Sequence, residues 1–136
     1  MSQALRPLRV LSPQERTEVN SFYKLMAVSL ARATSVVLTR NQFVEATIAE
    51  LLETVPDKLL LLSAWVTWFQ NREEGKTLKE LRWHVTQFQR ELDGSLAAVE
   101  DEYKQFQKFP KDALRFRSCD ELPIVVAYRL LEGGAQ

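Results

Sequence analysis

The most constraining feature of this sequence is a series of apolar residues at helical spacing between positions 78 and 106. They follow one another in steps of three and four, so a helix places them on one face. They are Leu78, Leu81, Val85, Phe88, Leu92, Leu96, Val99, Tyr103 and Phe106. The phase survives Asp93–Gly94, which predicts one continuous helix over residues 78–108, about 46 Å long at 1.5 Å per residue. Gly94 weakens a helix by about 1 kcal/mol relative to alanine, which leaves a kink there open.

The first helix is predicted over residues 13–38. Residues 12–15, Ser-Pro-Gln-Glu, have the form of a capping box with proline at the first helical position. The expected core stripe is Val19, Phe22, Tyr23, Met26, Leu30, Ala33 and Val37. The opposite face carries Ser21, Lys24, Val28, Ala31, Arg32 and Ser35. This small, partly apolar face either packs inside the protein's own bundle or accepts another helix or chain.

Capping residues, prolines and glycines delimit the other helices. A capping box at residues 39–42 predicts a helix that ends near Thr54, before Pro56. Asp57 is expected to cap a third helix that runs to residue 74. A capping box at residues 77–80 precedes the long helix.

The last helix is predicted over residues 121–132, with Asp120 as its cap and Pro123 at its third position. The segment PIVVAYRLL has the composition of a strand, but the chain offers no second strand to pair with it. The chain is therefore predicted to be all-α. We expect a single domain over residues 1–136, a bundle of about five helices with residues 1–11 as an irregular N-terminal arm.

Composition narrows the class of protein. The 136 residues are 46% hydrophobic and 26% charged, which is enough for a core without disulfides or metals. The formal net charge is zero, whereas a free-standing nucleic-acid-binding domain is usually basic. Cys119 is the single cysteine and fits a reducing compartment. The first residues lack the apolar segment of a signal peptide, and LLLLSAWVTWF (59–69) is too short to span a membrane, so a cytoplasmic protein is expected.

Residues 68–72, WFQNR, match a motif of the homeodomain recognition helix, whose asparagine contacts adenine. The match fails directly afterwards, because Glu73 and Glu74 would face phosphates and Gly75 stops the helix. Trp68 and Phe69 are explained more simply as core residues on the apolar face of an amphipathic helix. The other face of that helix is expected to carry Ser63, Thr67, Gln70 and Asn71. The match is therefore interpreted as coincidental.

The sequence offers little support for catalysis. His84 is the only histidine, at the edge of the apolar stripe, and a dyad of His84 with Cys119 stays open without any flanking motif. The acidic triplet at residues 100–102 is interpreted as a solvated face, because consecutive helical residues point in different directions. Phosphate-binding glycine loops and metal-binding motifs are absent from the sequence. We expect a non-enzymatic protein without a metal or cofactor.

Trp83 lies off the apolar stripe, about 140° from Leu78 at 100° per residue, among the cations Lys79, Arg82 and Arg90. Three explanations stay open. The tryptophan is a hot spot of a protein interface, a stacking platform for a single nucleic-acid strand, or a side chain that another helix of this chain covers.

Charge is distributed unevenly along the chain. Residues 1–40 hold six cations and two carboxylates, a balance of +4, whereas residues 41–75 hold six carboxylates and two cations, a balance of −4. Opposite ends of this kind steer head-to-tail association, and a basic end also attracts a phosphate backbone. The candidate nucleic-acid- or partner-binding residues are Arg6, Arg9, Arg16, Lys24, Arg32, Lys79, Arg82, Trp83, Arg90, Arg115 and Arg117.

In size, in helix content and in the apolar closing helix that ends VAYRLLEGG, the chain resembles the small helical subunits of CRISPR RNA-guided effector complexes. The resemblance implies a subunit for antiviral defence whose copies stack head to tail and support the guide–target duplex or the displaced strand through basic residues. It implies other protein subunits as partners, with RNA or single-stranded DNA in the assembled complex and no membrane. The alternative is a protein-only helical adaptor, chaperone or inhibitor that binds one protein partner.

Overall fold

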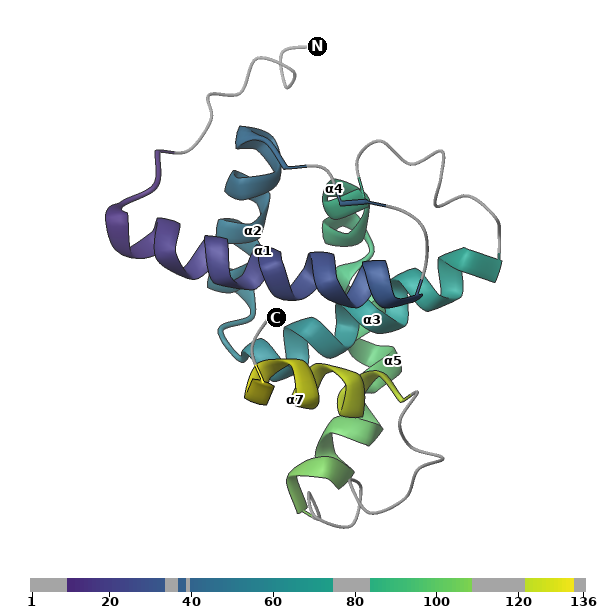
Figure 1. Ribbon diagram of the computed structural model, residues 1–136. Coiled ribbons are helices and arrows are strands. Elements are labelled where there is room, and N and C mark those ends of the chain that lie inside the picture. Colours follow the sequence, from purple (N-terminus) through teal and green to yellow (C-terminus); the bar gives the residue numbers. More distant parts are fainter. Residues whose placement is uncertain (1–9, 34–36, 39, 75–83, 109–121, 134–136) are drawn as a thin grey trace.

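The computed structural model describes residues 10–33, 37–38, 40–74, 84–108 and 122–133 (Figure 1). All regular secondary structure in these ranges is helical, which confirms the all-α prediction. The helices are α1 (Pro13–Ala33), α2 (Gln42–Thr54), α3 (Lys58–Glu74), α4 (His84–Arg90), α5 (Leu92–Lys108) and α7 (Pro123–Gly133). Of the expected arm over residues 1–11, the structure describes residues 10–11, which are not helical, and Leu11 packs against the core.

Two of the predicted helix starts are confirmed in atomic detail. At α1 the Ser12 backbone N–H donates to Glu15 Oε1 over 3.0 Å, and the Glu15 N–H donates to Ser12 Oγ over 3.1 Å, which is the reciprocal pair of a capping box. At α3 the Asp57 carboxylate accepts from the N–H groups of Leu59 and Leu60. Both caps satisfy backbone donors that have no partner inside the helix.

Two other helix starts differ from the prediction. The cap of α2 is Asn41, whose side chain accepts from the Val44 N–H over 2.9 Å, so the helix begins two residues later than a box headed by Thr39 requires. Pro123 is the first residue of α7, not its third, because a proline needs no N–H partner in the first turn. The helical interpretation of PIVVAYRLL is confirmed, and Asp120 lies outside the described residues.

The prediction that the first helix continues to residue 38 is wrong. α1 ends at Ala33, and Val37, expected in the core stripe, is 83% exposed. Leu38 is buried instead, and its carbonyl accepts a 2.7 Å hydrogen bond from Tyr23 Oη. The described residues of this segment, 37–38 and 40, therefore run back along α1, and contacts with side chains of α1 fix their position.

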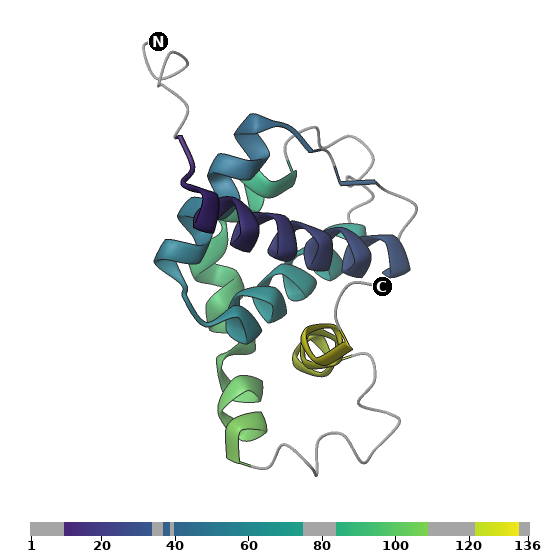
Figure 2. The same ribbon diagram turned by 60° about the vertical axis from the view of Figure 1, so that its left-hand side comes forward.

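The predicted amphipathic character of the third helix is also wrong. Six consecutive residues of α3, from Leu61 to Val66, are buried, so the helix is covered on all sides. Ser63, expected on a solvated face, is 0% exposed and donates its hydroxyl to the Leu59 carbonyl. Figures 1 and 2 show α3 in the middle of the molecule, where it contacts α1, α2, α5 and α7. A helix in this position is apolar all round.

Trp65 lies at the centre of this core with no exposed surface. Its ring stacks on Trp68 at 5.5 Å between centroids and meets Phe69 and Phe88 edge to face. Its indole N–H donates to the Met26 carbonyl at 3.1 Å and to a hydroxyl of the same α1 turn at 3.0 Å. Trp65 thus joins α3 to α1 and α4, and the prediction that Trp68 and Phe69 are core residues is confirmed.

The prediction of one helix over residues 78–108 is wrong in its described part, whereas residues 78–83 lie outside the described residues. Glu91 separates α4 from α5, and the longest described helix is α1, with 21 residues. Helical backbone hydrogen bonds continue on both sides of the break. The Glu91 N–H donates to the Gln87 and Phe88 carbonyls, and the Ser95 N–H donates to the Glu91 carbonyl. The apolar phase survives for that reason: the described stripe members from Val85 to Phe106 are buried or half-buried. α5 does not fold back on α4, because the two lie end to end (Figure 2).

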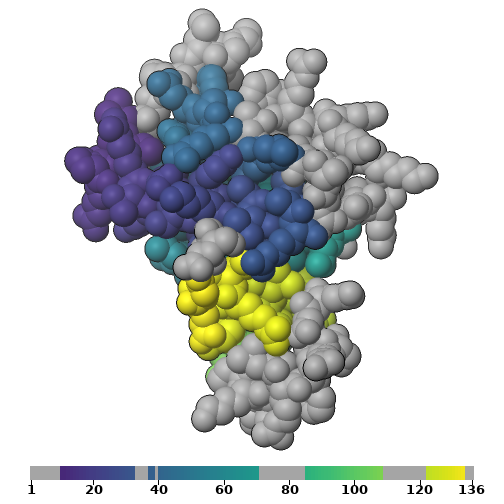
Figure 3. All heavy atoms as spheres, viewed as in Figure 1, coloured from purple at the N-terminus to yellow at the C-terminus, as the bar shows by residue number. Residues whose placement is uncertain are grey.

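A second, smaller core cluster packs the end of α5 against α7. Phe106, Ile124 and Val125 are buried, and the rings of Phe106 and Tyr128 lie 4.9 Å apart. α7 also contacts α1 and α3. Figure 3 shows α1 and α7 next to each other on one face of the molecule.

Replacing Trp65 with alanine is expected to lower the free energy of unfolding by about 3–5 kcal/mol, because the change removes a fully buried ring and its packing against two helices. Urea denaturation followed by circular dichroism measures the loss. Val37→Ala is the matched control, and its cost should stay below about 0.5 kcal/mol since Val37 is exposed. A Trp65→Ala effect below about 1 kcal/mol would contradict this description of the core.

Gly94→Ala is expected to raise the free energy of unfolding by roughly 0.5–1 kcal/mol. Gly94 is exposed inside α5, and a Cβ at this position meets nothing within 4 Å. Ala97→Gly, at another exposed position of α5, should lower stability by a similar amount. Destabilisation by Gly94→Ala in the same denaturation assay would show that the backbone at Gly94 is not helical.

Candidate functional site

Four of the candidate binding residues lie in described parts of the chain, and all four are exposed. They are Arg16, Lys24 and Arg32 on α1 and Arg90 at the end of α4. Seven lie outside the described residues: Arg6, Arg9, Lys79, Arg82, Trp83, Arg115 and Arg117. The surface predicted around Trp83 therefore stays a prediction, and α1 carries three of the four described candidate residues.

The outer face of α1 is exposed along most of its length. Ser21, Lys24, Ala31 and Arg32 are exposed, whereas Val28 is half-buried against the core. This face carries two cations and no carboxylate between residues 21 and 32, although the exposed Glu18 lies on the neighbouring flank. The helix thus packs its other side on α2, α3 and α7 and leaves a basic face of small side chains accessible.

Arg40 is brought to the flank of α1 by the segment that runs back along the helix. Its Nε donates to Glu45 Oε2 at 3.1 Å and its Nη2 donates to Asn20 Oδ1 at 2.7 Å. Its guanidinium also lies over the Tyr23 ring, 4.9 Å from the centroid. Burial raises the pKa of Tyr23, while the positive charge of Arg40 opposes that rise. These contacts hold a partly exposed guanidinium in one orientation.

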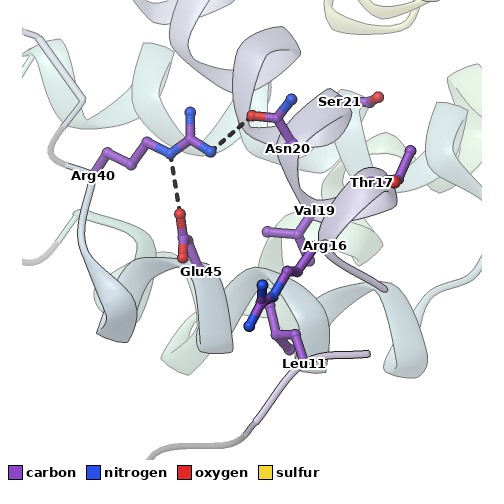
Figure 4. Close-up of a pocket in the computed structure, with 8 residues that line it drawn as sticks. All are labelled: Leu11, Arg16, Thr17, Val19, Asn20, Ser21, Arg40 and Glu45. Atoms are coloured by element: carbon purple, nitrogen blue, oxygen red, sulfur yellow. Dashed lines mark hydrogen bonds and ion pairs between the residues drawn. The ribbon is translucent and has the colours of Figure 1, made fainter. Parts of the chain in front are cut away.

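A hollow of about 460 Å³ opens between Arg40 and α1 (Figure 4). Arg40 and Glu45 line one side, and α1 residues line the other. The full lining is Leu11, Arg16, Thr17, Val19, Asn20, Ser21, Arg40 and Glu45. Two guanidinium groups and one carboxylate leave the hollow with one net positive charge, so it attracts anions.

Positive charges on this side of α1 are spaced by one helical turn. Arg16, Asn20 and Lys24 are four residues apart, so they lie along one side of α1 at intervals of about 6 Å. Asn20 carries no charge itself, but it binds the guanidinium of Arg40, which places a positive charge between Arg16 and Lys24. Arg40 was absent from the predicted site, since a position twenty residues away in sequence carries no sign of this contact.

The described parts of the two charge blocks do not lie at opposite ends of the molecule. α1 and α2 pack against each other, so the basic and acidic blocks lie side by side where described. The ion pair of Arg40 with Glu45 neutralises one charge of each block. On the other side of the α1–α2 contact a shallow hollow of about 80 Å³ has an acidic lining that includes Glu15, Glu18 and Glu53.

A polar cluster joins the start of α3 to α5. Tyr103 Oη donates to Asp57, the capping residue of α3, and accepts from Gln107 at 3.1 Å. The hydrogen bond to Asp57, helped by burial and by the carboxylate charge, raises the pKa of Tyr103 to about 12. Asp57 also binds backbone N–H groups, so this cluster fixes the junction of two helices.

The acidic triplet at residues 100–102 is only partly solvated. Glu100 and Asp101 are exposed as expected, but Glu102 is half-buried, and burial raises its pKa. Its Oε2 has no hydrogen-bond partner, and neither does the buried hydroxyl of Thr67. Glu102 lies on α5 and Thr67 on α3.

The described residues do not test the Cys119–His84 dyad that the sequence left open. The side chains of Cys119 and His84 lie outside what the structure describes, and the described parts hold no group of three His, Cys, Asp or Glu side chains placed to bind a metal ion. The WFQNR segment lies in α3, where Trp68 and Phe69 are buried in the core as expected, and the side chains of Asn71 and Arg72 lie outside what the structure describes.

Comparison of the chain with protein-family models, with curated proteins and with solved structures found no match. Within the described ranges, every helix is too short or too polar to span a membrane.

Tyr103→Phe is expected to lower the free energy of unfolding by about 0.5–1 kcal/mol at pH 8, since the change removes the Asp57 hydrogen bond near the surface. The pKa of Tyr103 is raised in the folded protein, so the bond contributes fully below the ordinary tyrosine pKa of 10.0. The contribution disappears as the pH rises from there to about 12. Urea denaturation of both proteins between pH 8 and 12 measures this; a difference independent of pH would contradict the assignment.

Proposed function

We propose that the protein is a non-enzymatic small helical subunit of a larger complex that holds nucleic acid. It supports assembly beside other protein subunits, which include copies of itself, and it contacts the backbone of RNA or single-stranded DNA through basic residues. The class of complex is that of the CRISPR RNA-guided effectors used in antiviral defence, which the sequence resembles in outline. A cytoplasmic location belongs to the same proposal, because a single cysteine fits a reducing compartment.

The observation that carries the proposal is the exposed face of α1. Lys24 and Arg32 project from it beside Ser21 and Ala31, whose small side chains allow a polymer backbone to approach closely. Cations supply the part of nucleic-acid affinity that does not depend on sequence. Because the formal net charge of the chain is zero, one copy alone is expected to bind weakly, and several copies along one strand would add their contributions.

The second candidate is a protein-only adaptor, chaperone or inhibitor. Exposed apolar side chains near the start of α2 favour it, since Phe43 is 54% exposed and Val37 is 83% exposed. Exposed aromatic residues are enriched in protein interfaces. This surface would bind one protein partner without nucleic acid.

The complex should be purified through the untagged chain from its own cells, and the nucleic acid in it should be measured before and after nuclease treatment. Lys24→Glu combined with Arg32→Glu is expected to abolish co-purification of nucleic acid. Binding that remains should depend less steeply on salt, by about 0.7 units of log–log slope for each phosphate that the variant no longer neutralises on a single strand.

Lys58→Glu combined with Lys108→Glu is the matched control, because both lysines are exposed and lie on other helices. This variant has the same net charge as the test variant and should keep the nucleic acid. A nucleic-acid-free complex with one protein partner, disrupted by Phe43→Ala and unaffected by the α1 changes, would replace the proposal with the adaptor.

A further inference from the structure

We propose that the hollow between Arg16 and Arg40 is a binding site for a phosphoryl group. The site lies on the flank of α1 and uses residues other than Lys24 and Arg32 of the outer face. This inference extends the proposed function. It rests on that function only if the phosphoryl group belongs to a nucleic-acid strand.

The first argument is the number of unused donors that line the hollow. Arg16 is exposed, and its guanidinium makes no hydrogen bond or ion pair with the described residues. Arg40 uses its Nε and one N–H of Nη2, so three of the five donors of a guanidinium stay available. Asn20 directs its Oδ1 to Arg40, which leaves its amide N–H groups free to donate.

The second argument is that half of the site is already in place. Glu45, Asn20 and the ring of Tyr23 hold the guanidinium of Arg40 on separate sides. Tyr23 is itself tied to the Leu38 carbonyl, just before Arg40 in the chain. Little side-chain freedom is therefore lost at Arg40 when an anion binds, whereas Arg16 adjusts to the ligand.

The third argument concerns the kind of anion. Arg16 and Asn20 of α1 and Arg40 of the segment opposite line the hollow with hydrogen-bond donors (Figure 4). A tetrahedral phosphoryl group presents oxygens in several directions, whereas a carboxylate presents two oxygens in one plane. Because the lining has one net positive charge, a phosphodiester with one negative charge neutralises it.

The phosphoryl group has two possible sources, a nucleic-acid backbone and a free phosphorylated molecule. The isolated chain labelled with ¹⁵N should be titrated with inorganic phosphate, with a single-stranded DNA dodecamer and with a hexa-aspartate peptide, while the Nε–H signals of Arg16 and Arg40 are followed. We expect both signals to shift with a phosphoryl probe. A dodecamer that binds more tightly than phosphate indicates a backbone, and shifts with phosphate alone indicate a free ligand.

Arg16→Gln and Arg40→Lys should each weaken binding of the phosphoryl probe about tenfold, since each removes charge-assisted hydrogen bonds. Lys108→Gln, a change on α5, should leave the affinity unchanged. Arg40→Lys keeps the charge but not the planar fork, so it separates geometry from net charge. Peptide binding tighter than both phosphoryl probes, unshifted arginine signals, or variants with unchanged affinity would each overturn the proposal.

The same variants separate this inference from the proposed function. Nucleic acid that co-purifies with Arg16→Gln but not with Lys24→Glu and Arg32→Glu would overturn the hollow as a nucleic-acid site and support the function. Phosphate binding by an isolated chain whose complex contains no nucleic acid would support the hollow and overturn the function.

Discussion

The packing of Trp65 is the interaction on which the arrangement of the other helices depends. Its ring fills the centre of the core, and its indole N–H is satisfied by the α1 backbone at Met26. Burying this large ring removes apolar surface from water without leaving a polar atom unpaired. Because the same ring also meets Phe88, one side chain fixes the position of α1 and α4 relative to α3. That position decides which face of α1 stays exposed and therefore where partners can bind.

The parts of the fold that sequence alone predicted are those decided by neighbouring residues. Ser12 and Asp57 form caps because their partners lie two or three residues ahead, and a local pattern records this. Helix type also follows from local periodicity, which is why each of the described helices lies in a segment that was expected to be helical. The apolar stripe from Val85 to Phe106 was correct in its burial for the same reason.

The errors arise where distant residues decide the outcome. The helix breaks at Glu91, whose carboxylate accepts a hydrogen bond from the indole N–H of Trp68 on α3. The spacing of the apolar residues continues across this single interrupted turn, so the sequence pattern does not reveal the break. Ser63 is buried because α3 is surrounded, which depends on the other helices and not on the pattern of α3 itself. The candidate site was predicted in part: Arg16 and Lys24 were chosen as cations of the first helix, but Arg40 reaches that helix only through folding.

The way α1 is held explains how a chain without net charge can still present an anion site. The inner side of α1 is fixed by the core, and its residue Tyr23 holds both the backbone at Leu38 and the guanidinium of Arg40. Arg40 is therefore positioned by the fold before any ligand arrives. Its ion pair with Glu45 keeps it oriented but cancels part of its field, which limits the affinity of one site. A site that is well ordered yet weak suits a protein that binds in several copies. Copies placed along one polyanion would add their contributions to the affinity, while a single copy would dissociate readily from the polyanion.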